Sequence, residues 1–363
     1  MISTLFLRDK RFGGKNDQLK TVAGALAAFV HGAASSIDVA IYDFRLDQPA
    51  AASTVVDALK STAERGIPVR IAYDAGKPTN GTQADFAAFE ADPAPVGTAD
   101  WLAQHFAGSR VQTKAIATHG QLMHSKYIVR DADAPKGTNS AVWTGSTNFT
   151  DDAWTFQENN IVIVSGSAVA GAYRTDFDQL WSVGAITGTG RGDHGTATAG
   201  SGTLGWDFCP GDGPAVNSAL ARRVTRATSR LIVAAMVLTS HDVLAALAAA
   251  TNRGISLSGV YDGGQMDPIV EQWERSRTDA AVLRNWRTVS AHLRRKQSTP
   301  YTPTSLHDFM HLKVLVADDT LVTGSYNFSA NAEHNAENQI SLTDASTVKA
   351  FVEYLHSVIA AYT

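Results

Sequence analysis

Two segments of the chain, residues 124–131 and 311–318, repeat the pattern His-x-Lys-x4-Asp. A methionine precedes each segment, and a Gly-Ser-x-Asn-Phe box follows at residues 145–149 and 324–328. Residues i and i+2 of a β-strand face the same side, so the His and the Lys of each copy are expected to point together. A polar pair that recurs with the same downstream box indicates a duplicated chemical site rather than ordinary residues on two amphipathic strands.

The residue types of this repeat suit chemistry at a phosphate group. Two lysines, with the hydroxyl and amide groups of the boxes, can bind an oxyanion. Two histidines on opposite sides of phosphorus can act in line, one as the nucleophile and the other as the acid that protonates the leaving oxygen. The expected catalytic pairs are His124 with Lys126 and His311 with Lys313, and the expected further phosphate ligands are Ser146, Asn148, Ser325 and Asn327.

Carboxylates stand at matching places in both copies. Glu158 and Glu337 each lie thirteen residues after the first glycine of their box. We expect these glutamates to hold the far nitrogens of the imidazoles, as the third member of a catalytic triad does; a solvated glutamate at a strand end is the alternative. Asp131 and Asp318 are further catalytic candidates at the ends of the repeated strands, where they would either contact substrate or stabilise the following turn.

The elements around the repeat predict an α/β fold with two similar α/β/α lobes. Helical spacing alternates with short apolar strands over residues 17–73, and the second half repeats this order. A duplicated chain usually packs its halves about a pseudo-twofold axis, which would bring both His–Lys pairs into one pocket. We predict an N-terminal lobe over residues 1–183, a glycine-rich linker or loop over 184–205, a C-terminal lobe over 206–363, and a surface loop over 77–100.

Composition describes an ordinary globular protein. The 363 residues are 44% hydrophobic and 18% charged, with a formal net charge of −4 that argues weakly against a general DNA-binding protein. The single cysteine, Cys209, cannot form an internal disulfide, and no apolar run approaches the ~20 residues of a membrane span. Charged residues at 8–11 interrupt the apolar N-terminus, so we expect a cytoplasmic monomer by default, or a secreted one if the sequence lacks its leader.

These motifs resemble those of the phospholipase D superfamily, whose signature is His-x-Lys-x4-Asp followed by a Gly-Ser-x-Asn box. The resemblance covers nearly the whole chain as two copies. It implies a two-lobed α/β/α fold, one active site at the lobe interface, no required metal or other cofactor, and a phosphohistidine intermediate that water or an alcohol resolves. It also implies that His124 is the nucleophile and His311 the general acid and then base. The glycine often found after the motif aspartate is absent, with Ala132 and Asp319 in its place.

The first hypothesis for the substrate is a phospholipid, whose headgroup would be released by hydrolysis or exchanged for another alcohol. The formal net charge of −4 supports this hypothesis over a nucleic acid substrate. So does a set of apolar side chains near the motifs, which core packing would also explain. This set is Trp143, Trp154, Phe156, Phe309 and Met310.

The second hypothesis is a nuclease with the same two-histidine chemistry, which makes nucleic acid the alternative partner. A basic and aromatic cluster supports it, although a solvated helix face would also produce such a cluster. The cluster comprises Arg284, Trp286, Arg287, His292, Arg294, Arg295 and Lys296. A third hypothesis, a non-catalytic scaffold, is disfavoured because both His–Lys pairs are intact. No clustered carboxylate pattern indicates a metal site, so the sequence predicts a metal-independent phosphodiesterase.

Overall fold

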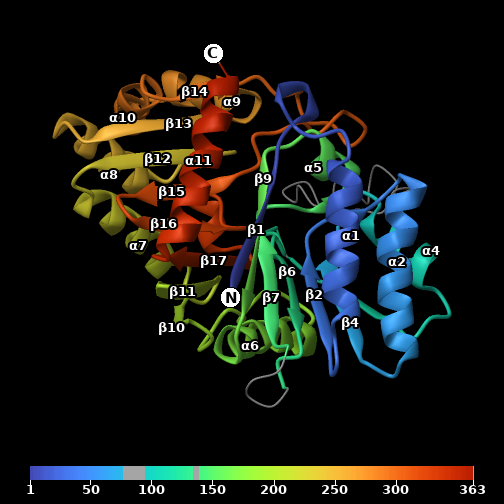
Figure 1. The fold of residues 1–363 in the computed structure, drawn as a ribbon. Coiled ribbons are helices and arrows are strands. Elements are labelled where there is room, and N and C mark those ends of the chain that lie inside the picture. The colour runs from blue at the N-terminus through green and yellow to red at the C-terminus, as the bar shows by residue number, and fades with distance from the viewer. Residues whose placement is uncertain (77–94, 119, 134–138, 363) are drawn as a thin grey trace.

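Two mixed β-sheets, each covered by helices on both faces, make up the protein (Figure 1). The computed structural model describes residues 1–76, 95–118, 120–133 and 139–362. Over these residues the N-terminal sheet has the strand order β1-β9-β7-β6-β2-β4-β5, and the C-terminal sheet has the order β10-β11-β17-β16-β15-β12-β13-β14.

The N-terminal lobe contains β1 (Ile2–Leu7), the 3-10 helix η1 (Lys10–Phe12), α1 (Gln18–His31), β2 (Ile37–Ile41), β3 (Phe44–Arg45), α2 (Pro49–Glu64), β4 (Val69–Asp74), α4 (Thr98–Phe106), β5 (Gln112–Ile116), β6 (Lys126–Arg130), β7 (Ala141–Gly145), β8 (Phe149–Thr150), α5 (Asp151–Thr155), β9 (Asn159–Ser165) and α6 (Ser167–Val183). The short strands β3 and β8 pair with each other outside the main sheet.

The C-terminal lobe contains β10 (Gly195–Ala199), β11 (Gly202–Cys209), α7 (Gly213–Arg226), β12 (Arg230–Ala235), α8 (His241–Asn252), β13 (Ser256–Asp262), α9 (Gly263–Arg275), α10 (Ala280–Ser290), β14 (Arg294–Lys296), β15 (Lys313–Ala317), β16 (Thr320–Gly324), the 3-10 helix η2 (Asn331–Glu333), β17 (Glu337–Leu342) and α11 (Ala345–Ala361).

The two sheets repeat one strand order. Strands β2, β4 and β5 run parallel, as do β12, β13 and β14. On the other side of β2 the strands β6, β7 and β9 follow in antiparallel pairs, and β15, β16 and β17 do the same beside β12. Beyond these, β1 pairs with β9 in one lobe and β11 pairs with β17 in the other, and β10 forms the sheet edge outside β11. The predicted α/β fold and internal duplication are therefore confirmed.

Alternation of apolar side chains across the strands builds three cores. Helices α6 and α11 lie between the two sheets, and their apolar faces share one central core with strand residues of both lobes (Figure 1). The opposite face of the N-terminal sheet packs on α1, α2, α4 and α5, and that of the C-terminal sheet packs on α7, α8, α9 and α10. The shared central core fixes the two lobes relative to each other, and therefore fixes the two His–Lys segments.

Two local expectations need correction. The glycine-rich segment 184–205 is not only a linker or loop, since it contains β10 and the start of β11, and this hairpin forms one edge of the C-terminal sheet. Alternating small side chains can pair in a sheet edge although they build no core of their own. Residues 77–94 of the predicted surface loop lie outside the described residues, and from Thr98 onwards the chain forms α4. No helix in the described part of the chain has both the length and the apolar character to cross a membrane.

Candidate active site

The two histidines of the repeat line one cavity of about 300 Å³, which we call the central cavity. Each imidazole is nearly buried, with His124 5% and His311 4% exposed. Both histidines lie two residues before their strand rather than within it, so that Lys126 and Lys313 are the first residues of β6 and β15. The duplication therefore brings its two reactive groups together, although neither lobe contains both.

An aspartate that recurs in both copies holds the backbone of the residue before each histidine. Asp74 at the end of β4 accepts the backbone N–H of Met123 at 2.8 Å, and Asp262 at the end of β13 accepts that of Met310 at 2.7 Å. Both aspartates belong to a Tyr-Asp pair that recurs in the two halves of the sequence. The pattern was visible as part of the repeat, but only the fold reveals that it anchors the residue before each histidine.

The first half-site consists of His124, Lys126 and Glu337. Nδ1 of His124 lies 2.9 Å from each carboxylate oxygen of Glu337, which comes from the first residue of β17 in the other lobe. The contact expected for Glu337 is therefore present. Burial raises the pKa of Glu337 to about 8, and Lys126 partly opposes this shift. Burial also lowers the pKa of His124 well below its usual value, and the nearby ammonium groups act in the same direction.

The second half-site consists of His311, Lys313 and Asn159. Nδ1 of His311 lies 3.0 Å from Oδ1 of Asn159, the first residue of β9 in the other lobe. The amide of Asn159 has a defined orientation, because its Nδ2 donates to the carbonyl of Ala153 and to Oε1 of Gln157, both at 3.1 Å. Its Oδ1 must therefore accept, so His311 carries a proton on Nδ1 and presents Nε2 to the cavity.

The expectation that Glu158 holds an imidazole is wrong. Gly145 pairs with Ile161, sixteen residues later, whereas Gly324 pairs with Gln339, fifteen residues later. The first copy is thus one residue longer between its box and its last strand, and Asn159 corresponds to Glu337. Glu158 instead forms a buried ion pair with Lys296 at 2.6 Å.

The two repeat lysines lie behind the imidazoles. Nζ of Lys126 donates to the carbonyl of His124, and Nζ of Lys313 donates to that of His311, both at 2.6 Å. Burial lowers the pKa of Lys126 to about 7, although Glu337 raises it, and burial also lowers the pKa of Lys313. With both lysines protonated, Glu337 ionised and both imidazoles neutral, these groups carry one net positive charge. That charge matches a phosphodiester monoanion, whose binding would favour the protonated lysines.

The Gly-Ser-x-Asn boxes shape the site mainly through their backbone. Gly145 and Gly324 have φ of +148° and +147°, and a Cβ there would lie 2.1 and 2.3 Å from a carbonyl oxygen of the neighbouring strand. Only glycine allows this close approach. The asparagines of both boxes, Asn148 and Asn327, line the central cavity, and within the described residues their Oδ1 atoms have no hydrogen-bond partner.

The serines of the boxes do not line the central cavity, which corrects their expected role as phosphate ligands. Ser146 is fully buried, and its hydroxyl accepts the N–H of Asn160 at 3.1 Å and donates to Oδ1 of Asn159 at 2.7 Å. The hydroxyl of Ser325 accepts the N–H of Asn338 at 2.9 Å. These hydroxyl groups position the strands that carry the imidazole partners.

Asp131 and Asp318 stabilise turns, and neither lines the central cavity. The carboxylate of Asp131 accepts the backbone N–H groups of residues 34–36, and that of Asp318 accepts those of residues 228–230. Both residues have positive φ, 55° and 50°, as the turn after each strand requires. Of the two expected roles for these aspartates, the structure provides the turn contacts.

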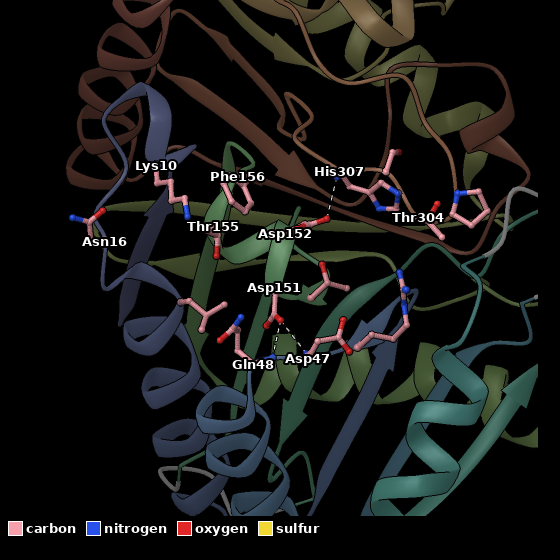
Figure 2. A pocket seen from close by; sticks show the side chains of 15 residues that line it. Lys10, Asn16, Asp47, Gln48, Asp151, Asp152, Thr155, Phe156, Thr304 and His307 are labelled. Atoms are coloured by element: carbon pink, nitrogen blue, oxygen red, sulfur yellow. Dashed lines mark hydrogen bonds between the residues drawn. The ribbon is translucent and has the colours of Figure 1, made fainter. Parts of the chain in front are cut away.

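A second, larger cavity of about 660 Å³ adjoins the central cavity, and we call it the polar cavity (Figure 2). The two cavities share Arg45, Thr150 and His307 as lining residues. Three carboxylates line the polar cavity, and its two cations already have partners: Arg45 with Asp43 at 2.8 Å, and Lys10 over the ring of Phe156 at 4.4 Å. The carboxylates are Asp47, Asp151 and Asp152.

The basic cluster proposed to contact nucleic acid is not a continuous free surface. Arg287 pairs with Glu274, Arg295 pairs with Asp267, and Lys296 is fully buried. Trp286 belongs to the core of the C-terminal lobe. Sequence proximity had grouped side chains that the fold points in different directions.

The apolar set near the motifs divides in a similar way. Trp143, Trp154 and Met310 are core residues, whereas Phe309 lines the central cavity and Phe156 the polar cavity. Sequence reasoning missed Tyr42, whose ring lies edge-on to His124 at 5.0 Å and 4.9 Å from Nζ of Lys126. Its place directly after β2 resembles that of Met236 after β12, so the repeat alignment contained a signal for both. In the described residues, no three His, Cys, Asp or Glu side chains gather in a way that could hold a metal ion.

Comparison with known proteins agrees with this geometry. The family model described as "Cardiolipin synthase, PLD-like domain" matches residues 26–181 and 220–359. No curated protein gives a match. Among solved structures, a phosphatidylserine synthase from Haemophilus influenzae Rd KW20 is similar, with a TM-score of 0.61 and 10% identity over 98% of this chain and 86% of that one.

A polyphosphate kinase from Porphyromonas gingivalis is also similar in structure, with a TM-score of 0.55 and 11% identity over 98% of this chain. This chain spans only 50% of the length of that kinase. A phospholipase D family member, Nuc from Salmonella typhimurium, is 22% identical over 45% of this chain and 97% of that one, with a TM-score of 0.34. At 10% and 11% identity, the likeness to the synthase and the kinase concerns the fold.

Proposed function

We propose, since this chain belongs to the phospholipase D-like family, that it is a metal-independent phosphodiesterase acting on phospholipid headgroups. In this proposal the reaction passes through a phosphohistidine, and either water or an alcohol resolves it. One observation carries the proposal: two imidazoles line a single cavity, and their Nδ1 atoms contact different acceptors, a carboxylate and an amide.

The two acceptors suit two different steps. Bonding of Nε2 to phosphorus leaves a positive charge on the ring, and a carboxylate at Nδ1 stabilises that charge. His124 with Glu337 is therefore the better nucleophile. A neutral amide stabilises imidazolium much less, so a protonated His311 gives up its Nε2 proton more readily. His311 with Asn159 is therefore the better general acid.

The proposed cycle balances its protons within these groups. Burial lowers the pKa of His311, so in this proposal His311 takes up its Nε2 proton as the phosphodiester anion binds. Nε2 of neutral His124 then attacks phosphorus while His311 donates this proton to the leaving alcohol oxygen, so an N–P bond forms and an O–P bond breaks. The neutral His311 then takes a proton from water or an acceptor alcohol as that oxygen attacks phosphorus and the N–P bond breaks. The site ends in its starting protonation state, with Lys126 and Lys313 supplying positive charge behind the imidazoles throughout.

Two observations support a phospholipid rather than a nucleic acid as substrate. The central cavity has apolar and aromatic walls at Leu122, Met236 and Phe309, which suit an acyl glycerol arm. The polar cavity contains more carboxylates than cations, and both cations have partners. Such a lining suits a hydroxyl-bearing or cationic headgroup and would repel the next phosphate of a polynucleotide.

A substrate panel in the presence of a chelator tests the proposal. The panel comprises vesicles of phosphatidylcholine and of phosphatidylglycerol, single- and double-stranded DNA, and bis-p-nitrophenyl phosphate. We expect release of phosphatidic acid from at least one phospholipid, and a phosphatidyl alcohol when ethanol is added. Cleavage of DNA alone, with the steep salt dependence of phosphate-backbone binding, would instead identify a nuclease.

A further inference from the structure

Backbone hydrogen bonds join the two lobes behind the first imidazole. The N–H of His124 donates to the carbonyl of Ala336 at 2.9 Å, and the N–H of Ala336 donates to that of Leu122 at 2.8 Å. Met123 and Ala336 also form a parallel β-bridge, and Ile116 belongs to the same apolar core. Backbone groups and apolar side chains therefore hold His124 beside its partner.

The second half-site has a charged pair at the corresponding place. Lys296 pairs with Asp262 in the sheet register as Ile116 pairs with Asp74, so Lys296 is the counterpart of Ile116. Glu158 directly precedes Asn159 and is the counterpart of Ala336. Among the backbone hydrogen bonds of the described residues, none joins residues 156–159 to residues 309–311.

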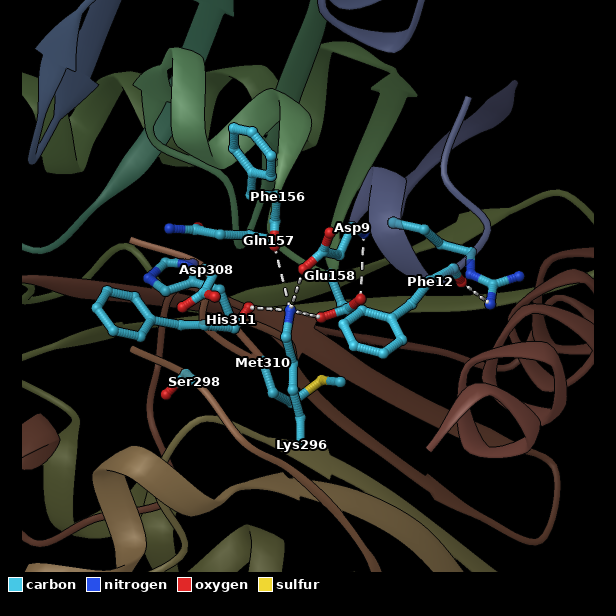
Figure 3. A network of polar contacts seen from close by, with 12 residues as sticks. Asp9, Phe12, Phe156, Gln157, Glu158, Lys296, Ser298, Asp308, Met310 and His311 are labelled. Carbon is cyan, nitrogen blue, oxygen red and sulfur yellow. Dashed lines mark hydrogen bonds and ion pairs between the residues drawn. The ribbon is translucent and has the colours of Figure 1, made fainter. Parts of the chain in front are cut away.

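The ammonium group of Lys296 takes the place of those missing backbone bonds. Lys296 is fully buried, and its Nζ lies 2.6 Å from Oε2 of Glu158 (Figure 3). It also lies 3.1 Å from the carbonyl oxygen of Phe156 and 3.4 Å from that of Phe309. One ammonium group thus bonds a carbonyl of each lobe, immediately beside the two residues of the second half-site.

The same pair is held from the outside by groups of both lobes. Oε1 of Glu158 accepts the N–H of Asp9 at 3.1 Å and the hydroxyl of Tyr362 at 2.5 Å. Nη2 of Arg11 lies 2.5 Å from Oδ2 of Asp9 and 2.6 Å from Oδ2 of Asp308. Asp308 is three residues before His311. These contacts connect the segment before His311 and the segment before Asn159 to Asp9 and Tyr362, which lie near the two ends of the chain.

We infer that Lys296, with Glu158, is a positioning residue for His311. Burying a lysine and a glutamate costs solvation that an apolar pair avoids, and the first half-site shows that an apolar pair fills the same place. Nζ of Lys296 bonds the carbonyl of Phe309, two residues before His311, and the carboxylate of Glu158, one residue before Asn159. The ion pair therefore holds the two segments that form the His311–Asn159 hydrogen bond. This inference rests on the proposed role of His311 as general acid.

The test measures how single-turnover rates depend on the leaving group. Bis-p-nitrophenyl phosphate releases a weakly basic p-nitrophenolate that needs little protonation, whereas diphenyl phosphate releases a more basic phenolate. The variant Lys296→Met with Glu158→Gln removes both charges and retains approximate shape. We expect phenol release to fall by about 10- to 100-fold and p-nitrophenol release by less than about 3-fold, because misplacing a general acid penalises the poor leaving group.

Two controls separate this inference from the proposed function. His311→Gln should show the same leaving-group dependence more strongly; if it shows none, His311 is not the acid and the proposed function fails. Arg70→Met with Asp38→Asn removes another partly buried ion pair, 2.6 Å long, that lines neither cavity. It should lower both rates equally or not at all.

A folded Lys296→Met, Glu158→Gln variant with an unchanged ratio of the two rates would overturn the inference and leave the pair a structural role only. If that variant does not fold, the same two rates are measured for Tyr362→Phe, which removes a single hydrogen bond to Glu158. Its ratio should shift in the same direction by about 2- to 12-fold, which is the range of one hydrogen bond. An unchanged ratio in Tyr362→Phe would count against the inference as well.

Discussion

The two half-sites place equivalent imidazoles in one cavity but give them different partners. His124 contacts a carboxylate and His311 an amide, and apolar residues support the first half-site where an ion pair supports the second. The strands, the lysines and the anchoring aspartates are alike in both. The comparison shows that duplication supplies the geometry of the site, while local differences in the following strands divide the chemical roles.

Removing either imidazole should have the largest effect. His124→Ala should abolish turnover with loss of at least about 10⁴-fold, because the variant lacks the nitrogen that the proposal assigns to the covalent bond. His311→Ala should lose about 10²- to 10⁴-fold, the usual contribution of a general acid. Mass spectrometry of the quenched His311→Asn variant with bis-p-nitrophenyl phosphate should reveal a phosphorylated His124. Near-wild-type turnover in either alanine variant would contradict the two-histidine mechanism.

Glu337→Gln should come next, with a loss of about 10²-fold in kcat/KM. The neutral amide would no longer stabilise the positive charge on a phosphorylated His124. Because burial raises the pKa of Glu337 to about 8, its carboxylate is protonated as the pH falls, and the wild-type kcat/KM should fall below about pH 8. A pH profile of Glu337→Gln should lack this acid limb. A limb that persists would mean that another group of the coupled site titrates there.

Asn159→Asp should have a smaller effect, about 10-fold, and of a different kind. A carboxylate beside His311 would raise the pKa of that imidazole and make it a weaker acid. The basic limb of the kcat profile should move to higher pH, and the loss should be greatest with basic leaving groups. Asn159→Ala serves as the control, since it removes the contact without adding a charge. A basic limb at the same pH in the wild-type protein and in the Asn159→Asp variant would show that His311 is not the titrating acid.

The two motif aspartates should have the smallest effect on catalysis. Burial by itself would raise the pKa of Asp131, but its hydrogen bonds to residues 34–36 lower the pKa overall, and those to residues 228–230 do the same for Asp318. Both carboxylates therefore stabilise the fold above their unfolded pKa of about 4, and this stability is lost as the pH falls through the lower folded pKa.

Asp131→Asn should accordingly lower the free energy of unfolding by about 1–3 kcal/mol at pH 7, and by less near pH 3, with kcat/KM unchanged. Asp318→Asn should show the same pattern with a smaller change, because Asp318 is partly exposed. Denaturant unfolding at both pH values measures the difference. A kcat loss in folded Asp131→Asn would restore this residue to the catalytic candidates.

The sequence was sufficient for the duplication, the fold class and the two histidines, because these depend on short patterns that survive in both copies. It was also sufficient for Glu337, which lies at a fixed distance after its box. The same count selected Glu158, and that choice failed because the first copy is one residue longer before β9. A one-residue change of register at a strand start exchanges the residue that meets the imidazole.

Other features could not be predicted because they depend on the pairing of distant segments. Lys296 follows two arginines in the sequence and was grouped with them, although β14 buries it between the lobes. Ser146 and Ser325 follow the box glycines and looked like phosphate ligands, but the tight approach of the neighbouring strand directs their hydroxyls to its backbone. Burial of a polar side chain is a property of the assembled layers rather than of a local pattern.

Each imidazole takes its partner from the opposite lobe, and this has a consequence for how such a site could arise. In a homodimer of identical single-lobe subunits, strict symmetry would place the same residue at both imidazoles, and any mutation of one partner would change the other as well. Joining the two copies in one polypeptide removes that constraint. A carboxylate can then face one histidine and an amide the other, so nucleophile and acid can be tuned by separate mutations.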